Sequence, residues 1–368
     1  MRRSLFALLI VAVSMCMNAF AAPVSVFANG TEGYRCFRIP AIVQTPDGTL
    51  LAFAEARRKS CADFGDVRIV LRTSKDKGKT WSALHVVASN GHPQTGNPSP
   101  VVDTLDPRYP RGRVFLFYNT GDAPESAIDR GQGTRRTWYR ISVDDGATWS
   151  APVDITANVK LPSWRGYAAG PGHALQLTAG PHAGRIVVAA NHTTGGPPST
   201  SEAHSFFSDD HGRSWHLGAT VDWPGSNEST VAQGAHGSVV MNSRDQSGKT
   251  HARIISISDD GSAHWRSPFV AHDLPDAICE GSMIAYSPQK GVPVLLFSNA
   301  ANTKERRELT ISVSRDNGHT WPKHTLIYPG PSAYSDLIIM RNGRLGILWE
   351  QGNEGGIVFA NRPLSPLF

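Results

Sequence analysis

Cysteine is scarce in this chain, with four residues among 368. Cys16 lies in an N-terminal segment that we expect to be removed, so Cys36, Cys61 and Cys279 remain, an odd number for an exported protein. Cys36 and Cys61 each precede a candidate site residue by two positions, so they could be neighbours able to form a disulfide. Three buried, unpaired thiols are the favoured alternative.

Metal-binding motifs are also missing. The 14 histidines include no HExxH pair, and no two cysteines have the CxxC spacing of a zinc site. The aspartate-rich turns lack the further acidic ligands and the closing glutamate of an EF-hand. We therefore expect this protein to use no metal and no other cofactor.

Beyond its N terminus, the chain lacks any apolar run that approaches the roughly 20 residues of a membrane span. The N terminus itself combines Arg2 and Arg3, a short apolar run and the small-residue sequence AFAA. This pattern predicts a signal peptide over residues 1–22 and not a membrane anchor. We expect residues 23–368 to be exported to the periplasm or the medium, with no membrane span.

Clustered charge and helical periodicity are absent as well. The 36 lysines and arginines barely outnumber the 31 acidic residues, and they are dispersed along the chain. A nucleic acid would favour a clustered basic strip with interleaved aromatic residues, so nucleic-acid binding is not expected, whereas a mild positive excess suits an anionic ligand. No long stretch repeats apolar residues at helical spacing, and 35 glycines and 25 prolines indicate an all-β chain.

What the chain does contain is a repeated octapeptide, S-x-D-x-G-x-[TS]-W. Each intact copy follows a short run of strand-forming residues, so the serine closes a strand and the remainder turns the chain into a hairpin. The aspartate can accept hydrogen bonds from its own turn, the glycine can adopt a positive φ, and the tryptophan begins the return strand. Four copies are intact and the fifth is degenerate: Ser74–Trp81, Ser142–Trp149, Ser208–Trp215, Ser314–Trp321 and, degenerate, Ser258–Trp265.

The spacing of these boxes predicts a six-bladed β-propeller. Successive box tryptophans are 50 to 68 residues apart, which is the length of a four-stranded blade with generous loops. Five blades would carry a box that ties the third strand to the fourth, and one blade would not. No linker divides the chain, so we expect one domain over residues 23–368 and a ligand site built from loops of several blades near the axis.

Three arginines are embedded in separate motifs: Arg38 in YRCFRIP, Arg244 in VVMNSRD and Arg306 in the segment before LTISVS. A planar guanidinium grips a carboxylate through two hydrogen bonds. Several guanidinium groups that converge on one axis repel each other unless they bind an anion. Arg307 competes with Arg306 for the third position.

With these motifs the chain resembles the retaining exo-sialidases, or neuraminidases, a family that includes bacterial secreted and animal enzymes. The resemblance runs from about residue 34 to residue 350 and rests on the F-R-I-P motif, the Asp-boxes, and Glu, Arg, Arg and Tyr in that order. It implies an enzyme that hydrolyses terminal sialic acids from oligosaccharides, glycoproteins and glycolipids. It also implies that Arg38, Arg244 and Arg306 hold the sialic acid carboxylate and that Glu350 orients Arg38.

The same resemblance assigns the catalytic positions. The segment FAEARRKSCADFGD gives Arg57 as a further sialic acid contact and Asp63 as the acid/base residue, with Asp66 as its rival. The segments SNESTVAQ and GPSAYSD give Glu228 as a base and Tyr334 as the nucleophile. One departure from the family pattern is Asn97, which stands where many relatives place an aspartate that contacts O4 of the sugar.

These residue types suit the chemistry. An anomeric carbon that bears a carboxylate repels an anionic nucleophile, whereas a neutral tyrosine can approach it. Tyrosine has a pKa of about 10, so Glu228 must accept its proton. Asp63 would protonate the leaving oxygen and later deprotonate the attacking water.

The sequence leaves two alternatives to hydrolysis open. A trans-sialidase would differ only in passing the sugar to an acceptor instead of water. A non-catalytic propeller would share the Asp-boxes and only bind glycans, although the joint presence of Asp63, Glu228 and Tyr334 argues against it. We expect a monomer.

Overall fold

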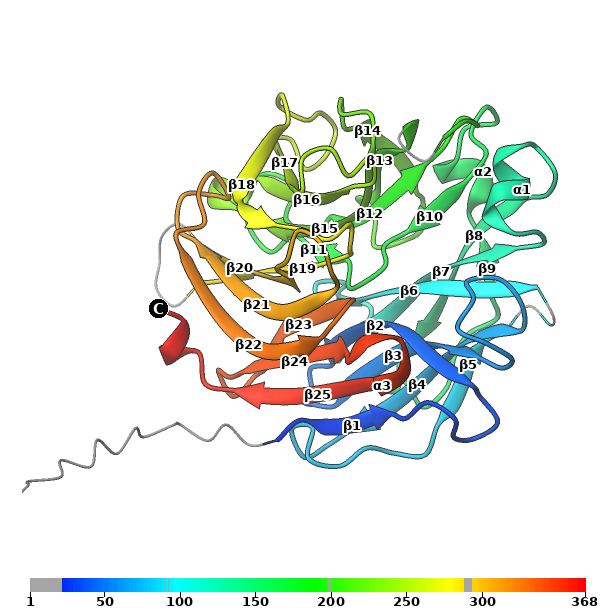
Figure 1. Cartoon of the computed structure of the whole chain (residues 1–368), viewed down its shortest axis with the longest axis horizontal. Coiled ribbons are helices and arrows are strands. Elements are labelled where there is room, and N and C mark those ends of the chain that lie inside the picture. Colours follow the sequence, from blue (N-terminus) through cyan, green and yellow to red (C-terminus); the bar gives the residue numbers. More distant parts are fainter. Residues whose placement is uncertain (1–21, 90, 92, 198–199, 288–292) are drawn as a thin grey trace, which may run out of the picture.

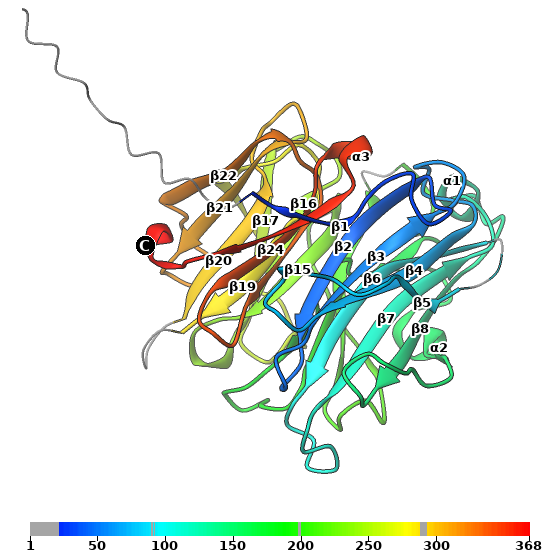
Figure 2. The ribbon, with the colours of Figure 1, turned by 90° about the horizontal axis from the view of Figure 1, so that it is seen from below.

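A computed structural model describes residues 22–89, 91, 93–197, 200–287 and 293–368. Its strands form six antiparallel sheets that fan around a central axis, as Figure 1 shows. The view from below shows the same sheets stacked side by side like blades (Figure 2). The all-β, six-bladed prediction is therefore confirmed, whereas the predicted signal peptide lies, except for Ala22, outside the described residues.

The first three blades follow the chain from their inner strand outward. β11 adds a fifth strand to the third blade by pairing with β12. The strands of these blades are β2 (Cys36–Gln44), β3 (Leu50–Arg57), β4 (Val67–Ser74) and β5 (His85–Ala88); β6 (Gln94–Asp103), β7 (Arg113–Gly121), β8 (Arg135–Ser142) and β9 (Val153–Asp154); and β10 (Tyr167–Ala169), β11 (Leu175–Gln176), β12 (Ile186–His192), β13 (Glu202–Ser208) and β14 (His216–Thr220).

The fourth and fifth blades repeat this order, and the sixth begins in the same way with its inner strand. Their strands are β15 (Ser226–Gln233), β16 (Val239–Asp245), β17 (Ala252–Ser258) and β18 (Phe269–Pro275); β19 (Ser282–Tyr286), β20 (Val294–Ala300), β21 (Arg307–Ser314) and β22 (Lys323–Pro331); and β23 (Ser335–Ile339), β24 (Leu345–Glu350) and β25 (Ile357–Arg362).

The described helices are short and lie in the loops between strands. None of those in the described part of the chain has the length and apolar character needed to cross a membrane. They are α1 (Glu125–Asp129), α2 (Thr156–Val159) and α3 (Gly352–Gly355), with the 3₁₀ turns η2 (Ala235–Gly237) and η3 (Ser365–Leu367).

The two ends of the chain close the ring. β1 (Val24–Phe27) pairs antiparallel with β25 and supplies the outer strand of the sixth blade. Phe27 then stacks on Phe37 of the first blade, with ring centroids 5.5 Å apart. Because backbone hydrogen bonds join the two ends, the last blade leaves fewer unpaired edge groups than a three-stranded blade would.

Each Asp-box is a hairpin turn between the third and fourth strands of its blade, as the sequence predicts. In the second blade, Ser142 Oγ donates to Asp144 Oδ1 at 2.9 Å and accepts the Gly146 N–H at 2.9 Å. Asp144 also accepts the N–H of Thr148 at 2.9 Å and its hydroxyl at 2.5 Å. One carboxylate therefore satisfies three donors of its own turn.

The box tryptophans and glycines also pack against the neighbouring blade. Trp149 of the second blade lies 5.9 Å from Phe53 of the first, and Trp215 of the third lies 4.9 Å from Phe117 of the second, measured between ring centroids. A Cβ atom at Gly212 would lie 2.6 Å from a side chain of the second blade. The boxes thus fix the contact between neighbouring blades as well as the hairpin.

The core lies between the blades. Phe115, Phe117 and Tyr139 of the second blade form one buried cluster with Phe206 and Trp215 of the third. Similar clusters fill the other inter-blade spaces. Close packing of this kind holds the blades at fixed angles, which fixes the positions of the loops at the axis.

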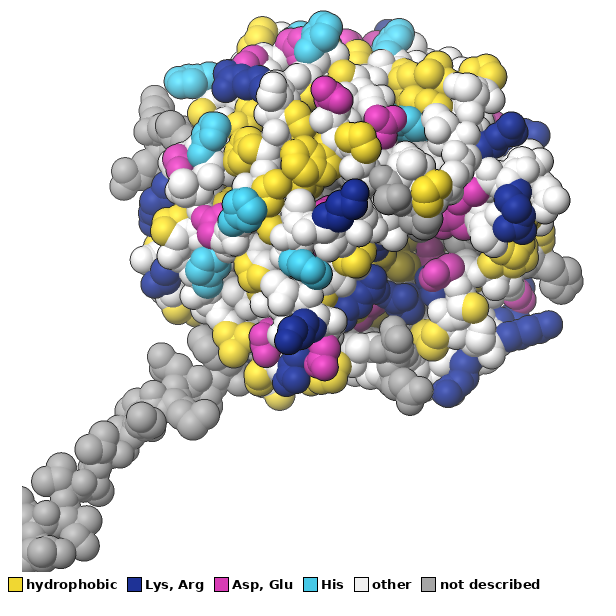
Figure 3. Space-filling model, turned by 45° about the horizontal axis from the view of Figure 1, so that its top comes forward, with side chains coloured by type: hydrophobic (Ala, Val, Ile, Leu, Met, Phe, Trp, Pro, Cys, Tyr) yellow, Lys and Arg dark blue, Asp and Glu magenta, His cyan; other side chains and the backbone are white. Residues whose placement is uncertain are grey.

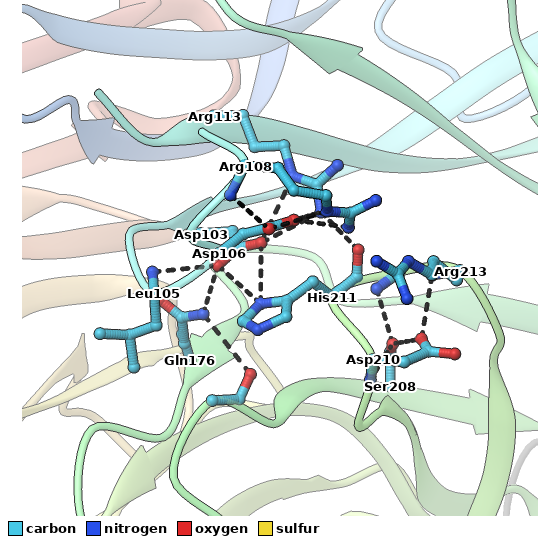
Figure 4. Close-up of polar contacts among 12 residues, drawn as sticks. Asp103, Leu105, Asp106, Arg108, Arg113, Gln176, Ser208, Asp210, His211 and Arg213 are labelled. Atoms are coloured by element: carbon cyan, nitrogen blue, oxygen red, sulfur yellow. Dashed lines mark hydrogen bonds and ion pairs between the residues drawn. The ribbon is translucent and has the colours of Figure 1, made fainter. Parts of the chain in front are cut away.

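A buried polar cluster adds a second link between the second and third blades (Figure 4). Asp103 and Asp106 lie 3.2 and 2.8 Å from the guanidinium of Arg113. Gln176 donates to Asp103 at 2.6 Å, and His211 Nδ1, from the third Asp-box, lies 3.2 Å from the same carboxylate. The carboxylates and the imidazole are close enough to hold a metal ion, but the Arg113 guanidinium already supplies the positive charge. The cluster is therefore an ion-pair network that joins the two blades.

The degenerate box keeps its geometry despite two substitutions. Ser262, where the other boxes have glycine, adopts the same left-handed backbone with φ of 77°, and its N–H donates to Ser258 Oγ at 2.8 Å. His264 replaces the usual threonine, and its Nδ1 lies 2.6 Å from Asp260 Oδ2. The turn survives, but with a side chain in a conformation that favours glycine.

We therefore expect Ser262→Gly to stabilise the protein. The substitution relieves a left-handed conformation, worth about 1 kcal/mol, and removes a buried hydroxyl that has no partner among the described residues. Urea unfolding measures the change as a higher midpoint with an unchanged slope. The matched control is Gly146→Ser, which should destabilise because its Cβ would lie 2.8 Å from Leu51. An equal or lower midpoint for Ser262→Gly would contradict this account.

Candidate active site

A cavity of about 1010 Å³ opens on the axis, on the face where the inner strands begin. Figure 3 shows this hollow with basic and acidic side chains in its walls. Every blade contributes lining residues, so the site depends on closure of the whole ring. One from each blade in turn is Arg38, Asn97, Tyr167, Glu228, Arg306 and Tyr334.

Bulges in the inner strands aim several of these side chains. The register of β2 shifts between Arg38 and Ala41, that of β6 shifts on either side of Asn97, and that of β15 shifts around Glu228. Ile39, within the first of these bulges, has a positive φ of 59°. Such irregularities re-aim a side chain and release it from the alternation of the strand. The pleat alone would not bring these three residues to the cavity.

Arg38 is held by Glu350, the residue that the family resemblance pairs with it. Its Nε and Nη2 atoms lie 3.0 and 2.9 Å from the two carboxylate oxygens. Glu350 is buried and also accepts the N–H groups of Ile39 at 2.8 Å and Tyr334 at 3.2 Å. This carboxylate therefore fixes Arg38 and the backbone at Tyr334 together.

Arg244 and Arg306 approach the same tyrosine from other blades. Arg244 Nη1 lies 2.8 Å from Glu228 and donates to Tyr334 Oη at 3.1 Å. Its Nε is buried and has no partner among the described residues. The guanidinium carbons of Arg38 and Arg306 lie 5.2 and 5.6 Å from the centroid of the Tyr334 ring. Three guanidinium groups thus surround one aromatic side chain.

Arg307, the rival of Arg306, does not line the cavity. Its guanidinium donates to the carbonyl of Pro329 and lies 3.5 Å from the exposed carboxylates of Glu305 and Glu308. Arg306 lines the cavity, and its Nη2 donates to the carbonyl of Ile278 at 2.6 Å. The structure therefore brings Arg306, and not Arg307, to the other two arginines.

Carboxylates keep the buried arginines charged. Burial alone disfavours the charge on Arg38 and Arg244, but Glu350 outweighs this effect for the first and raises its pKa. Glu228 and Tyr334 raise the pKa of Arg244 in the same way. The cavity therefore presents fixed positive charge at neutral pH.

Tyr334 and Glu228 form a short hydrogen bond. The Tyr334 hydroxyl donates to Glu228 Oε2 at 2.6 Å, and the tyrosine is buried. Burial, followed by the negative charge of Glu228, raises the pKa of the phenol well above its ordinary value, while Arg244 and Arg306 act in the opposite direction. The free site thus holds a neutral phenol with a base already in place.

Asp63 lies on the loop between β3 and β4, at the rim of the cavity. Its side chain is 81% exposed, and Oδ1 lies 2.8 Å from Nη1 of the buried Arg57. Arg57 is fixed by Glu55, whose Oε2 accepts from Nε at 3.0 Å and from Nη2 at 2.7 Å. Asp66, the rival position, is 8% exposed, pairs with Arg58 at 3.1 Å and does not line the cavity.

A disulfide between Cys36 and Cys61 ties this loop to the start of β2. The favoured expectation of three unpaired thiols was therefore wrong, and among the cysteines that the structure describes only the buried Cys279 is free. The carbonyl of Cys61 also accepts a 2.5 Å hydrogen bond from Arg57. The loop that carries Asp63 is thus anchored to the strand that carries Arg38.

Sequence reasoning missed two carboxyl groups that support the site. Glu55 accepts the N–H of Asn97 at 2.8 Å as well as pairing with Arg57. Its position two residues before Arg57 in β3 places both side chains on one face, and this spacing could have revealed it. Glu280 accepts the N–H of Ser335 at 3.1 Å, directly after Tyr334, and no motif marks it.

Comparisons with known proteins place this geometry in context. The family model of the BNR repeat-like domain matches residues 40–347. A sialidase of Micromonospora viridifaciens is 35% identical over 350 residues, which cover 90% of this chain and 52% of that protein. Sialidase-2 of Cricetulus griseus is 31% identical over 377 residues, which cover 94% of this chain and 96% of that protein.

A solved structure shares the fold at similar identity. The Hadza microbial sialidase Hz136 is 28% identical, with a TM-score of 0.81, and the match covers 94% of this chain and 69% of that one. The chain spans about half the length of the Micromonospora protein. It corresponds to nearly the whole of the Cricetulus protein.

Glu280 gives a prediction for stability against pH. Burial, together with the charges of Asp336 and Glu228, raises its pKa well above the ordinary value, so the folded protein keeps a proton that the unfolded chain loses. Below the ordinary glutamate pKa of about 4.3, this proton makes its full contribution to the free energy of unfolding. As pH rises above that value, the free energy of unfolding falls by at most about 1.4 kcal/mol per pH unit.

Glu280→Gln should therefore flatten the fall in unfolding free energy between pH 5 and pH 8. The glutamine keeps an oxygen to accept the N–H of Ser335 and carries no proton to lose. Denaturant titrations at several pH values measure this slope, and the exposed Glu305→Gln provides the control. Parallel profiles for wild type and Glu280→Gln would show that Glu280 does not hold the proton.

Proposed function

The chain belongs to the sialidase family of BNR-repeat proteins, and from this membership we propose that it is an exo-α-sialidase. It hydrolyses terminal α-ketosidic sialic acids of oligosaccharides, glycoproteins and glycolipids, with retention through a tyrosyl-enzyme intermediate. The observation that carries the proposal is the 2.6 Å hydrogen bond from Tyr334 to Glu228 inside a ring of three arginines.

Recognition begins with the sugar carboxylate. Arg38, Arg244 and Arg306 come from three blades, and the partnerless Nε of Arg244 is a buried donor in need of an acceptor. A carboxylate accepts hydrogen bonds from several guanidinium donors and relieves their mutual repulsion. Binding this group holds the anomeric carbon next to Tyr334.

In the first step, Tyr334 Oη forms a bond to the anomeric carbon as the bond to the glycosidic oxygen breaks. Glu228 takes the phenolic proton, and Asp63 gives a proton to the leaving oxygen. Arg244 lies 3.1 Å from the phenolic oxygen and stabilises the negative charge that develops there. The neutral phenol avoids the repulsion that a carboxylate nucleophile would meet from the sugar carboxylate.

In the second step, water attacks the same carbon and the bond to Tyr334 breaks. Asp63 removes a proton from the water, while Glu228 returns one to the departing phenolate. Two inversions at one carbon give net retention. The 81% exposure of Asp63 in the free protein suits a group that must meet both the leaving sugar and water.

We also propose that the chain is exported after cleavage behind residue 22. The basic and apolar N-terminal sequence supports this, and the first described strand begins at Val24. Mass spectrometry of the secreted protein reads the new N terminus directly. Retention of the full N terminus in the exported protein would refute the cleavage.

Tyr334→Phe should lower the turnover of 3′-sialyllactose and of a methylumbelliferyl sialoside at least about a hundredfold, because it removes the nucleophilic oxygen. The matched control is Tyr286→Phe, which changes a half-buried tyrosine that does not line the cavity and should retain activity. Retained hydrolysis by a folded Tyr334→Phe variant would sink the tyrosyl mechanism.

Asp63→Asn should discriminate between these two substrates. The loss should reach about a hundredfold to ten-thousandfold on sialyllactose, whose sugar oxygen needs a proton to leave. The loss should be smaller on the methylumbelliferyl sialoside, whose leaving group departs as a stable anion. The ratio of kcat/KM values on the two substrates measures the effect, and an equal loss on both would remove Asp63 from the acid role.

A further inference from the structure

A second pocket lies beside the catalytic cavity on the same face of the propeller. It has a volume of about 520 Å³ and is formed by the start of β8, the end of β9, α2 and the loop that follows α2. Arg135 lines both hollows, so the two are neighbours.

Positive charge in the second pocket exceeds negative charge. Four basic residues line it, Arg135, Arg136, Lys160 and Arg165, against one carboxylate, Asp154. That carboxylate is already engaged, because it lies 3.0 Å from Arg136 and accepts hydrogen bonds from Thr156.

The other three cations have no ion-pair partner of their own. Within the described part of the chain, no carboxylate oxygen lies within ion-pair distance of Arg135, Lys160 or Arg165. Lys160 donates to the carbonyl of Trp164 at 2.5 Å, and Arg135 donates to the side-chain carbonyl of Gln94. Neutral carbonyl oxygens thus stand where Arg38, Arg57 and Arg244 of the cavity have carboxylates.

The electrostatics of the two hollows differ accordingly. Burial, and then the charge of Arg165, lowers the pKa of Lys160, and burial lowers the pKa of Arg135. In the cavity, by contrast, carboxylates raise the pKa values of Arg38 and Arg244. The second pocket therefore has less negative than positive charge, and an anionic ligand would supply the difference.

The position of Arg135 points to the source of that anion. Carboxylates of the cavity favour its charge, Glu125 most, Glu55 next and Asp63 less, and Arg135 also lines the second pocket. Asp63 would protonate the oxygen that joins the terminal sialic acid to the rest of the glycan, so the remaining sugar leaves the cavity next to Asp63. Arg135 lines both hollows and so connects this cavity with the second pocket.

We propose that the second pocket is a subsite for an anionic sugar that follows the cleaved sialic acid. This inference rests on the proposed function. The ligand group is a carboxylate or a sulfate, either on a second sialic acid or on a sulfated neutral sugar. Arg165 and Lys160 bind the anion, and the exposed Leu161 offers an apolar surface for the ring of the sugar.

The test compares substrates with neutral and anionic sugars at this position. The substrates are 3′-sialyllactose, α2,8-disialyllactose, and sialyllactose sulfated on its galactose. Arg165→Gln should lower kcat/KM for the two anionic substrates by about threefold to tenfold and leave 3′-sialyllactose unchanged, because the contact is a partly exposed ion pair. Lys160→Gln should act in the same direction, and thermal unfolding checks that both variants are folded.

The control is Arg213→Gln, which removes an exposed arginine from an Asp-box on the opposite face and should change none of the three substrates. A loss on the disialyl substrate alone identifies a second sialic acid as the occupant, and a loss on the sulfated substrate alone identifies a sulfated sugar. Equal effects of Arg165→Gln on neutral and anionic substrates, or no effect on any, would overturn the proposal.

Failure of the proposed function gives a different result. A protein without sialidase activity would release sugar from none of the substrates. Calorimetric titration then tests the pocket separately, with α2,8-disialic acid against monomeric sialic acid as the two ligands. Wild type should bind the dimer more tightly and Arg165→Gln should lose that preference, whereas equal affinities in wild type would refute the subsite.

Discussion

Arg38 and Arg244 share one cavity with a carboxylate beside each, and these two ion pairs organise the centre of the protein. Glu350 holds Arg38, and Glu228 lies next to Arg244. Each carboxylate has further duties: Glu350 accepts the backbone at Tyr334, and Glu228 accepts the hydrogen bond of its phenol. In the proposed mechanism, the positive charge that would bind the substrate anion and the base that would activate Tyr334 are thus parts of one network.

The propeller makes this network possible because its blades are fixed from outside. The Asp-boxes lie on the face opposite the cavity, where their tryptophans pack against the preceding blade. The ion-pair network around Asp103 joins the second and third blades in the same way. With the angles between blades fixed there, inner strands can carry bulges at Arg38, Asn97 and Glu228 without loss of the fold.

The difference between the local contacts of the Asp-boxes and the long-range contacts of the cavity explains what could be predicted from the sequence. The boxes encode their own turns through local contacts, so five hairpins and the blade count follow from the chain, and even Ser262 preserves the turn. The order of motifs predicted Arg38, Glu228 and Tyr334 as site residues, and the structure brings them together at one cavity. The bulges were not predictable, since β-branched Ile39 disfavours its positive φ, and Glu280 was missed because a lone glutamate resembles a surface residue until its burial is known.

The two hollows on the active face differ in how they use charge. Carboxylates pair with Arg38, Arg57 and Arg244 of the cavity, so recognition there depends on the directions of buried donors and is weakly screened by salt. Lys160 and Arg165 of the second pocket have no carboxylate partner within the described part of the chain. Their attraction for an anion therefore extends further and weakens as ionic strength rises. A glycan with several negative charges would be attracted to the second pocket before it enters the cavity. The proposed subsite would therefore orient an anionic glycan before its terminal sugar reaches Tyr334.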